Sequence, residues 1–173
     1  MHNGFVTING EKMSKSLGNI ILVKDLSEKY HGEVIRLALL SSHYRQGLDW
    51  NDQVAHQAKK LLDKLYKILE DLSDTINKES KNISPDFIAS LMDDLNTPGF
   101  LANLNKLIKD FDLIKTEEDR SIFKSKLILC GEILGILQEE PSSWFNEELE
   151  NIDKNKIDKL VASRLEAKAQ KDY

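Results

Sequence analysis

Two lysines and two serines alternate near the start of the chain, in the segment Lys12-Met13-Ser14-Lys15-Ser16. The lysines are three residues apart, and Gly18 and Asn19 follow in the same polar stretch. Ammonium groups, hydroxyls and backbone N–H groups are the donors with which proteins hold a polyphosphate. The segment therefore predicts contact with phosphates, and a solvated surface loop is the alternative.

A mobile loop can bring Lys12 and Lys15 closest to a polyphosphate while negative charge shifts during attack on an α-phosphorus. Only contacts that strengthen in the transition state accelerate the chemical step. We therefore expect both lysines to be catalytic and residues 12–16 to form the phosphate-binding loop.

The residues before this loop predict a β-hairpin over residues 4–13. Phe5-Val6-Thr7-Ile8 is a β-branched and aromatic run, and Asn9-Gly10 tolerates the positive φ angles of a tight turn. The returning strand leads directly into the lysines. The hairpin would hold the loop at its base and leave its tip free.

Two short helices are expected after the loop. Asp25 and Glu28 fit a capping box for a helix that ends near Gly32. A mostly apolar helix then covers residues 33–42, and residues 43–47 end it.

Three longer helices follow, each with an apolar stripe at helical spacing. Asn51 is the expected N-cap of the first helix, Thr97 is the expected N-cap of the second, and the third stops before Pro141. The stripes are Val54, Ala58, Leu61, Leu65, Ile68 and Leu72, with Leu62, Leu69 and Ile76 on one flank; Phe100, Leu104, Leu107 and Phe111; and Phe123, Leu127, Cys130, Leu134 and Leu137.

A short helix from Ser84-Pro85 to Leu91 and a last helical segment from about Asp153 complete the pattern. Wide stripes joined by short loops indicate a compact antiparallel bundle. The predicted fold is mainly α, with a short β-hairpin and connector helices followed by this helix bundle. The expected domains are residues 1–50, 51–140 and 141–173.

The composition is that of a globular chain, since 40% of the 173 residues are hydrophobic and 31% are charged. No apolar run approaches the roughly 18 residues of a membrane span. The single cysteine, Cys130, excludes an internal disulfide and a Cys-paired metal site, so we expect a cytoplasmic protein. The net charge is −5, but residues 1–47 hold six basic and four acidic side chains. Phosphate contacts would therefore be local.

A second group of side chains could contact an RNA backbone: Tyr44, Arg45, Lys59, Lys60 and Lys64. A solvated helix face is the alternative for these lysines. Other residues favour structural roles. Cys130 lies within an apolar stripe, Asp93 and Asp94 stand where a cap or an ion pair is expected, and Trp50 and Trp144 suit core packing.

The segment 10–19, Gly10-Glu11-Lys12-Met13-Ser14-Lys15-Ser16-Leu17-Gly18-Asn19, resembles the KMSKS loop of class I aminoacyl-tRNA synthetases. The lead-in His2-Asn3-Gly4-Phe5 is similar to the cysteinyl branch of that family. Segments 43–45 (His43-Tyr44-Arg45), 92–98 (Met92-Asp93-Asp94-Leu95-Asn96-Thr97-Pro98) and 164–173 follow in the family's order, although Leu95 replaces an aromatic residue. The resemblance spans nearly the whole chain.

The resemblance implies part of a cysteine–tRNA ligase, in which Lys12 and Lys15, helped by residues 13, 14 and 16, bind the phosphates of ATP. ATP would enter the parent enzyme with Mg²⁺. Cysteine, ATP and the tRNA for cysteine would be the partners of a monomeric parent enzyme. Residues 20–50 would contact the inner tRNA stem, and the helices after Trp50 the anticodon side. The nucleotide-binding sheet and the zinc that selects cysteine would precede Met1, so the chain alone is expected to be inactive and to hold no metal.

Two alternatives remain open from the residues. The chain could be a stand-alone RNA-binding helical module that retains a KMSKS-like loop. It could also belong to a related ligase that joins cysteine to an amino sugar.

Overall fold

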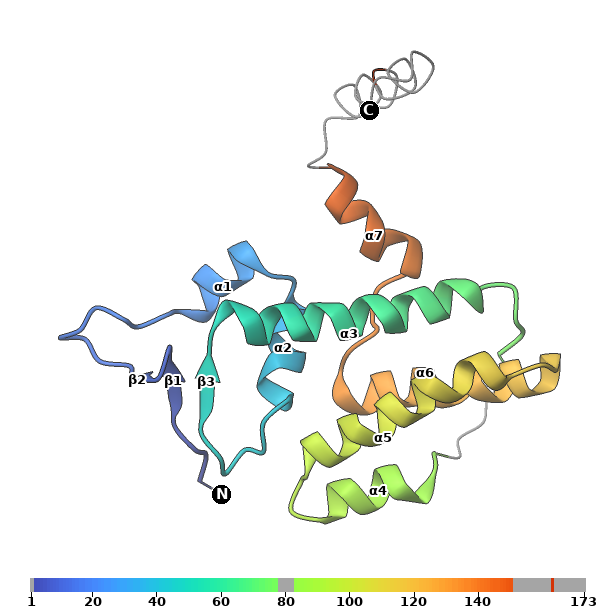
Figure 1. The fold of residues 1–173 in the computed structure, drawn as a ribbon, viewed down its shortest axis with the longest axis horizontal. Helices are drawn as coiled ribbons and strands as arrows, with labels where there is room; N and C mark the ends of the chain where they lie inside the picture. Colours follow the sequence, from blue (N-terminus) through green and yellow to red (C-terminus); the bar gives the residue numbers. More distant parts are fainter. Residues whose placement is uncertain (1, 78–82, 151–162, 164–173) are drawn as a thin grey trace. The chain divides into compact units, whose positions relative to one another are not determined.

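The structure is a computed structural model that describes residues 2–77, 83–150 and 163. The chain divides into two compact units, residues 1–138 and 139–173. Helices dominate the described residues, so the predicted mainly α class is confirmed (Figure 1). The predicted domain boundaries at residues 50 and 140 stay predictions.

The first unit begins with the expected hairpin. Strands β1 (Val6–Ile8) and β2 (Glu11–Lys12) pair in antiparallel fashion around Asn9 and Gly10, whose φ angles are 50° and 81°. Both residue types tolerate positive φ, which explains why the chain reverses there. A third strand, β3 (Leu48–Trp50), pairs with β1 in parallel, with Ile8 opposite Trp50. The sequence analysis missed this strand.

Two short helices connect the loop to β3. Helix α1 covers Val23–Lys29, and α2 covers Gly32–Leu40. The N-cap of α2 is His31, whose Nδ1 accepts a hydrogen bond from the N–H of Glu33. Both helices were predicted, but their ends differ from the expected ones.

Four helices form the rest of the first unit, and consecutive ones run in opposite directions (Figure 1). They are α3 (Asp52–Asp71), α4 (Pro85–Met92), α5 (Thr97–Asp110) and α6 (Glu117–Leu134), with the 3-10 turn η1 (Phe111–Leu113) between the last two. Asn51 caps α3 as predicted, because its side chain accepts a hydrogen bond from the N–H of Val54. The antiparallel helix bundle is confirmed.

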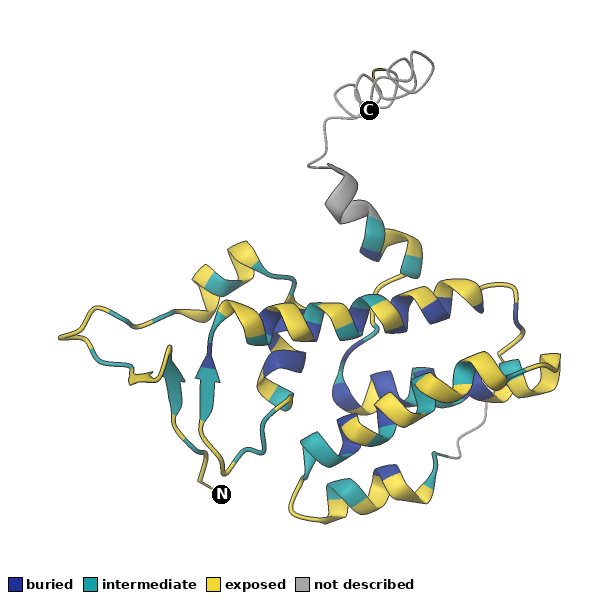
Figure 2. Ribbon diagram, in the orientation of Figure 1, coloured by how far each residue is buried: buried dark blue, intermediate teal, exposed yellow. Residues whose placement is uncertain are grey.

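Buried residues lie along one face of α3 and of α5, and α6 buries residues on more than one side (Figure 2). Their side chains form the core. Leu62, Leu65 and Tyr66 of α3 are fully buried, and Phe100 of α5 packs edge to face against Phe87 of α4 at 4.7 Å between ring centroids. The buried face of α3 is turned slightly from the predicted stripe. Val54 and Leu61 are only half-buried, and Ile76 is exposed.

Several predicted helix ends are wrong. The Asp25–Glu28 capping box does not form, because α1 already starts at Val23 and its N-cap, Leu22, makes no side-chain cap bond. Asn96, not Thr97, caps α5, since its Oδ1 accepts from the N–H of Gly99 at 2.9 Å.

The predicted third long helix also ends early. Helix α6 stops at Leu134 because Gly135 adopts a left-handed conformation with φ of 66°. Leu137, expected as the last residue of its stripe, therefore lies outside the helix.

In the second unit, helix α7 covers Pro141–Glu150 and buries Trp144, as expected for a packing role. The sequence analysis placed a helix only from about residue 153, which lies outside the described residues, as does segment 164–173. Among the residues that the structure describes, no helix has the length and apolar character required to cross a membrane.

Candidate functional site

The lysine–serine loop begins directly at the end of β2. Lys12 is the last residue of that strand, and its ammonium lies 4.8 Å from the centroid of the Phe5 ring, a cation–π contact with the neighbouring strand region. Lys15 is exposed and begins a turn in which the N–H of Gly18 donates to the Lys15 carbonyl at 3.3 Å. Both candidate catalytic lysines therefore belong to one short loop held by the hairpin.

Asn19 closes this loop. Its side-chain oxygen accepts from the N–H of Ser14 at 2.9 Å, and its side-chain nitrogen donates to the carbonyl of Lys12 at 3.3 Å. The loop is therefore fastened at its base by one amide group. This positioning role was missed, although the sequence analysis named Asn19 as part of the same polar stretch.

The two serines of the loop contact each other. Their hydroxyl oxygens are 3.1 Å apart, and the Ser14 hydroxyl also accepts from the N–H of Leu17 at 3.2 Å. The serine hydroxyls thus shape the turn that presents Lys15, while Met13 is half-buried behind it. The predicted phosphate-binding role of residues 12–16 stays a prediction.

Asp49 of β3 stabilises the hairpin turn. Its carboxylate accepts from the N–H of Gly10 at 2.7 Å and from the Thr7 hydroxyl at 2.8 Å. These two hydrogen bonds, that of Gly10 first, hold the pKa of Asp49 below its ordinary value. The loop-bearing hairpin is thereby attached to a strand from a distant part of the sequence.

The turn after α2 is attached to the same sheet. The N–H of Gly4 donates to the Tyr44 carbonyl at 2.6 Å, and a side chain at Gly4 would overlap the backbone of Gln46. Only glycine permits this approach. Residues 43–47 therefore lie against the start of the hairpin.

Tyr44 and Arg45, predicted to bind RNA, both contact Asp94 between α4 and α5. The Arg45 guanidinium donates to the two carboxylate oxygens at 2.6 and 3.1 Å, and the Tyr44 hydroxyl donates at 2.7 Å. His43 adds a contact of 3.0 Å between its Nε2 and the Asp94 carbonyl. We call this group (His43, Tyr44, Arg45 and Asp94) the Asp94 latch.

The latch fulfils the predicted ion-pair role of Asp94. Arg45 is the main cause, and Tyr44 the second, of a pKa of Asp94 below its ordinary value. Asp94 itself has a φ of 49°, a conformation that aspartate and asparagine tolerate better than most residues. The Arg45 side chain nevertheless remains 64% exposed, so its outer face is accessible.

The three lysines predicted to contact RNA differ in their surroundings. Lys59 pairs with Asp63 one helical turn on, at 2.6 Å. Lys60 and Lys64 are exposed, and neither forms an ion pair within the described parts of the chain. Their role in RNA binding stays a prediction.

A buried carboxylate connects α2 to the end of the bundle. Glu33 accepts from the Tyr66 hydroxyl at 3.0 Å and from the N–H groups of Leu137 and Gln138 at 2.9 and 2.8 Å. All these partners are neutral donors, which compensate for its burial. The sequence analysis did not predict these hydrogen bonds, because the partners of Glu33 lie far from it in the sequence.

Cys130 is buried as expected, and burial raises the pKa of its thiol to about 12. Among residues 2–77 and 83–150, no group of three or more His, Cys, Asp or Glu side chains could hold a metal ion.

Comparisons with known proteins cover the whole chain. Residues 1–60, which include the sheet and the loop, match the family described as tRNA synthetases class I (C) catalytic domain. Residues 86–138, from α4 to the Glu33 contact, match the DALR domain. The whole chain is 47% identical to a cysteine–tRNA ligase of Rickettsia peacockii (strain Rustic) and 46% identical to one of Rickettsia conorii.

The chain belongs to the cysteine–tRNA ligase family. Another family member, from Rickettsia bellii (strain OSU 85-389), is 42% identical over the same full span. The chain covers 36% of the length of the first two ligases, about a third of each.

The fold of this ligase-family chain also occurs in a solved structure. That structure is the LeuRS of Agrobacterium radiobacter K84, in its ternary complex with tRNA and LeuAMS, with a TM-score of 0.60 and 17% identity. The match covers 77% of this chain and 20% of that one. At this identity the likeness concerns the fold alone.

Proposed function

We propose that this chain supplies the ATP-phosphate loop and the tRNA-binding helices of a cysteine–tRNA ligase. The alignment of the complete chain with cysteine–tRNA ligases at 42–47% identity carries the proposal. The exposed Lys15, presented by a fastened turn on a hairpin, is the arrangement that such a function requires.

In the reaction, a carboxylate oxygen of cysteine attacks the α-phosphorus of ATP, and pyrophosphate leaves. Lys12 and Lys15 stabilise the negative charge that moves onto the departing phosphates, which lowers the barrier because the interaction strengthens in the transition state. ATP would enter with Mg²⁺. A terminal ribose hydroxyl of the tRNA for cysteine then attacks the carbonyl carbon of the cysteinyl-adenylate, and AMP leaves.

The helices from α3 to α6 would contact the tRNA, with the exposed Lys60 and Lys64 near its backbone. The exposed face of Arg45 would contribute while its other face holds Asp94. We propose that the parent ligase is cytoplasmic and monomeric.

A chimeric ligase tests this proposal. This chain replaces the aligned segment of the Rickettsia peacockii ligase, and cysteine-dependent exchange between ATP and pyrophosphate is measured, followed by charging of tRNA. The chimera is expected to perform both reactions. Lys12→Ala and Lys15→Ala should each lower the exchange rate by roughly 100-fold.

Lys24→Ala is the matched control, because Lys24 is an exposed lysine of α1 outside the loop. Exchange at the unmodified rate in the Lys15→Ala chimera would contradict the assigned role of the loop. The separate chain is expected to show no exchange, and clear activity there would contradict its dependence on the rest of the ligase.

A further inference from the structure

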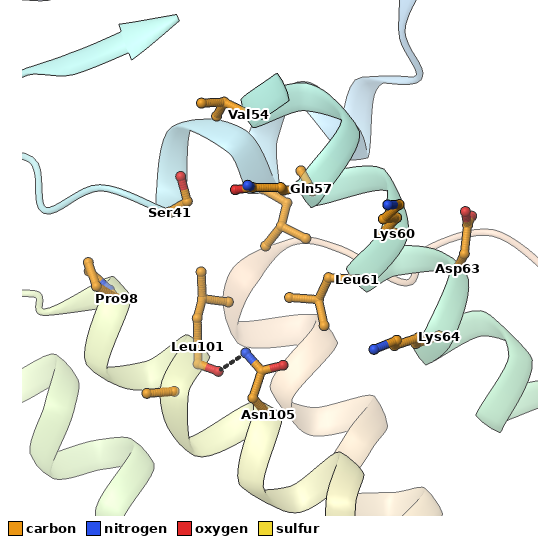
Figure 3. A pocket seen from close by; sticks show the side chains of 13 residues that line it. Ser41, Val54, Gln57, Lys60, Leu61, Asp63, Lys64, Pro98, Leu101 and Asn105 are labelled. Atoms are coloured by element: carbon orange, nitrogen blue, oxygen red, sulfur yellow. Dashed lines mark hydrogen bonds between the residues drawn. The ribbon is translucent and has the colours of Figure 1, made fainter. Parts of the chain in front are cut away.

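An open cleft of about 630 Å³ lies between α3 and α5 within the first unit (Figure 3). This volume falls within the range of protein sites for small ligands. Leu61 of α3 and Leu101 of α5 face each other across it, and Leu37, Ala58 and Pro98 add further apolar surface. The cleft therefore has an aliphatic floor to which α3 and α5 both contribute.

Two cations border this floor. Lys60 and Lys64 line the cleft, and the ammonium of Lys64 points from α3 toward Asn105 on α5 (Figure 3). The one carboxylate in the lining, that of Asp63, is engaged by Lys59 at 2.6 Å. The rim thus carries positive charge suited to an anion.

Two amide groups complete the lining. The side-chain nitrogen of Asn105 donates to the carbonyl of Leu101 at 3.0 Å, which leaves its oxygen available as an acceptor. Gln57 makes no side-chain hydrogen bond within the part of the chain that the structure describes. Amides that border an aliphatic floor can pair with the edge of a nucleobase. An acyl chain offers no group that pairs with the Asn105 oxygen or the Gln57 amide, whereas the edge of a base does.

One end of the cleft lies close to the Asp94 latch. Ser41 and Pro98 line that end, and each lies a few residues from the latch. The latch connects the segment after α2 to the segment before α5, and so attaches the start of the α5 wall to the segment after α2. A preformed site loses less conformational freedom when a ligand binds.

We propose that this cleft binds one unstacked nucleotide of the tRNA. The base packs between Leu61 and Leu101, its edge pairs with Gln57 or Asn105, and Lys60 and Lys64 contact the adjoining phosphates. This inference rests on the proposed tRNA-binding function and adds to it a defined pocket, so that RNA is held by a base as well as by its backbone.

The first test blocks the cleft without changing charge. Ala102 is exposed on α5 and lines the cleft, so Ala102→Trp fills it while the core remains intact. The matched control is Ala89→Trp, at an exposed position on α4 outside the lining. Binding of a transcript of the tRNA for cysteine to the complete chain is measured by fluorescence anisotropy. Ala102→Trp should weaken it about tenfold, and Ala89→Trp less than about twofold.

The second test removes the cations. The double variant Lys60→Gln, Lys64→Gln should weaken binding and lower the slope of log affinity against log salt by about one for each phosphate that the chain no longer neutralises. The control pair Lys109→Gln, Lys115→Gln removes equal charge from exposed positions outside the cleft and should leave the slope nearly unchanged. Equal slopes for the two pairs would overturn the phosphate assignment.

A third test identifies the occupant. Ultraviolet cross-linking of a transcript that contains 4-thiouridine should join the RNA to residues 57–64 or 98–105, and Ala102→Trp should abolish these products. If Ala102→Trp leaves the cross-links or the affinity unchanged, the cleft is not the nucleotide site, although the chain still binds tRNA. If adenosine monophosphate occupies the cleft and the transcript does not compete with it, a free nucleotide is the ligand and the inference is overturned. A complete chain that binds no transcript overturns the proposed function as well.

Discussion

The guanidinium of Arg45 donates to both carboxylate oxygens of Asp94, at 2.6 and 3.1 Å. The two residues are 49 positions apart, and each stands in a segment between helices. Arg45 lies shortly before β3, which pairs with the strand of the hairpin that carries the lysine loop, and Asp94 lies just before α5. This bidentate pair therefore connects the sheet that holds the candidate ATP loop to the helices proposed to bind tRNA.

Weakening the latch should loosen the segment between α4 and α5. Asp94→Asn preserves the shape of the side chain and suits the left-handed backbone, so it removes mainly the charge that Arg45 and Tyr44 contact. We expect a fall in Tm of a few degrees, roughly 2–4 °C, measured by circular dichroism. Asp93→Asn is the control, because the Asp93 carboxylate accepts from the nearby Asn96 side chain and lies outside the latch. Equal Tm values for Asp94→Asn and Asp93→Asn would show that the latch contributes nothing to stability.

Removing the Asn19 amide should free the lysine loop. Asn19→Ala deletes both hydrogen bonds that connect residue 19 to Ser14 and Lys12. Exchange of the Ser14 amide hydrogen, followed by NMR, should become roughly 5- to 10-fold faster, because a net hydrogen bond of about 1 kcal/mol is removed. Asn3→Ala, at an exposed position, provides the control. Unchanged exchange at Ser14 would mean that the amide does not fasten the loop.

The hairpin turn should weaken in acid. Because hydrogen bonds from Gly10 and Thr7 lower the pKa of Asp49 in the folded chain, the unfolded chain binds the proton more readily. The stabilisation is present above the ordinary carboxyl value of about pH 4 and disappears as the pH falls through the lowered pKa. An NMR titration should show the Gly10 amide resonance moving below about pH 4. Asp49→Asn should abolish this pH-dependent movement. If the Gly10 resonance still moves in that variant, a group other than Asp49 titrates near it.

Cys130 should be inert in the folded chain. With a pKa of about 12, only about one thiol in ten thousand is ionised at pH 8, and burial also blocks access. Its reaction with a coloured disulfide reagent should be more than about 100-fold slower in buffer than in about 8 M urea. Fast reaction of the native chain would show that α6 opens readily. The Cys130→Ala variant, which has no thiol, gives the background signal of the reagent.

Local patterns were sufficient for much of this protein. Asn9-Gly10 predicted the hairpin because both residues accept the positive φ angles that a tight turn needs, and Asn51 predicted the start of α3 because its side chain reaches the N–H of its own third neighbour. The apolar spacing predicted the long helices, because burial of one face repeats with the helical turn. The motif of residues 10–19, followed by segments 43–45 and 92–98 in order, indicated the family, since each motif lies within a few consecutive residues.

Contacts between distant segments could not be predicted in this way. The pairing of β3 with β1, the four hydrogen bonds at Glu33 and the cleft between α3 and α5 depend on where separate elements pack. The sequence alone was enough to predict the loop, the helices and the candidate lysines, because turn preferences and apolar periodicity depend on residues only a few positions apart. That Arg45 meets Asp94, and that Lys60 and Lys64 border a cleft, followed only from the folded chain, because packing across 40 residues and more sets those positions.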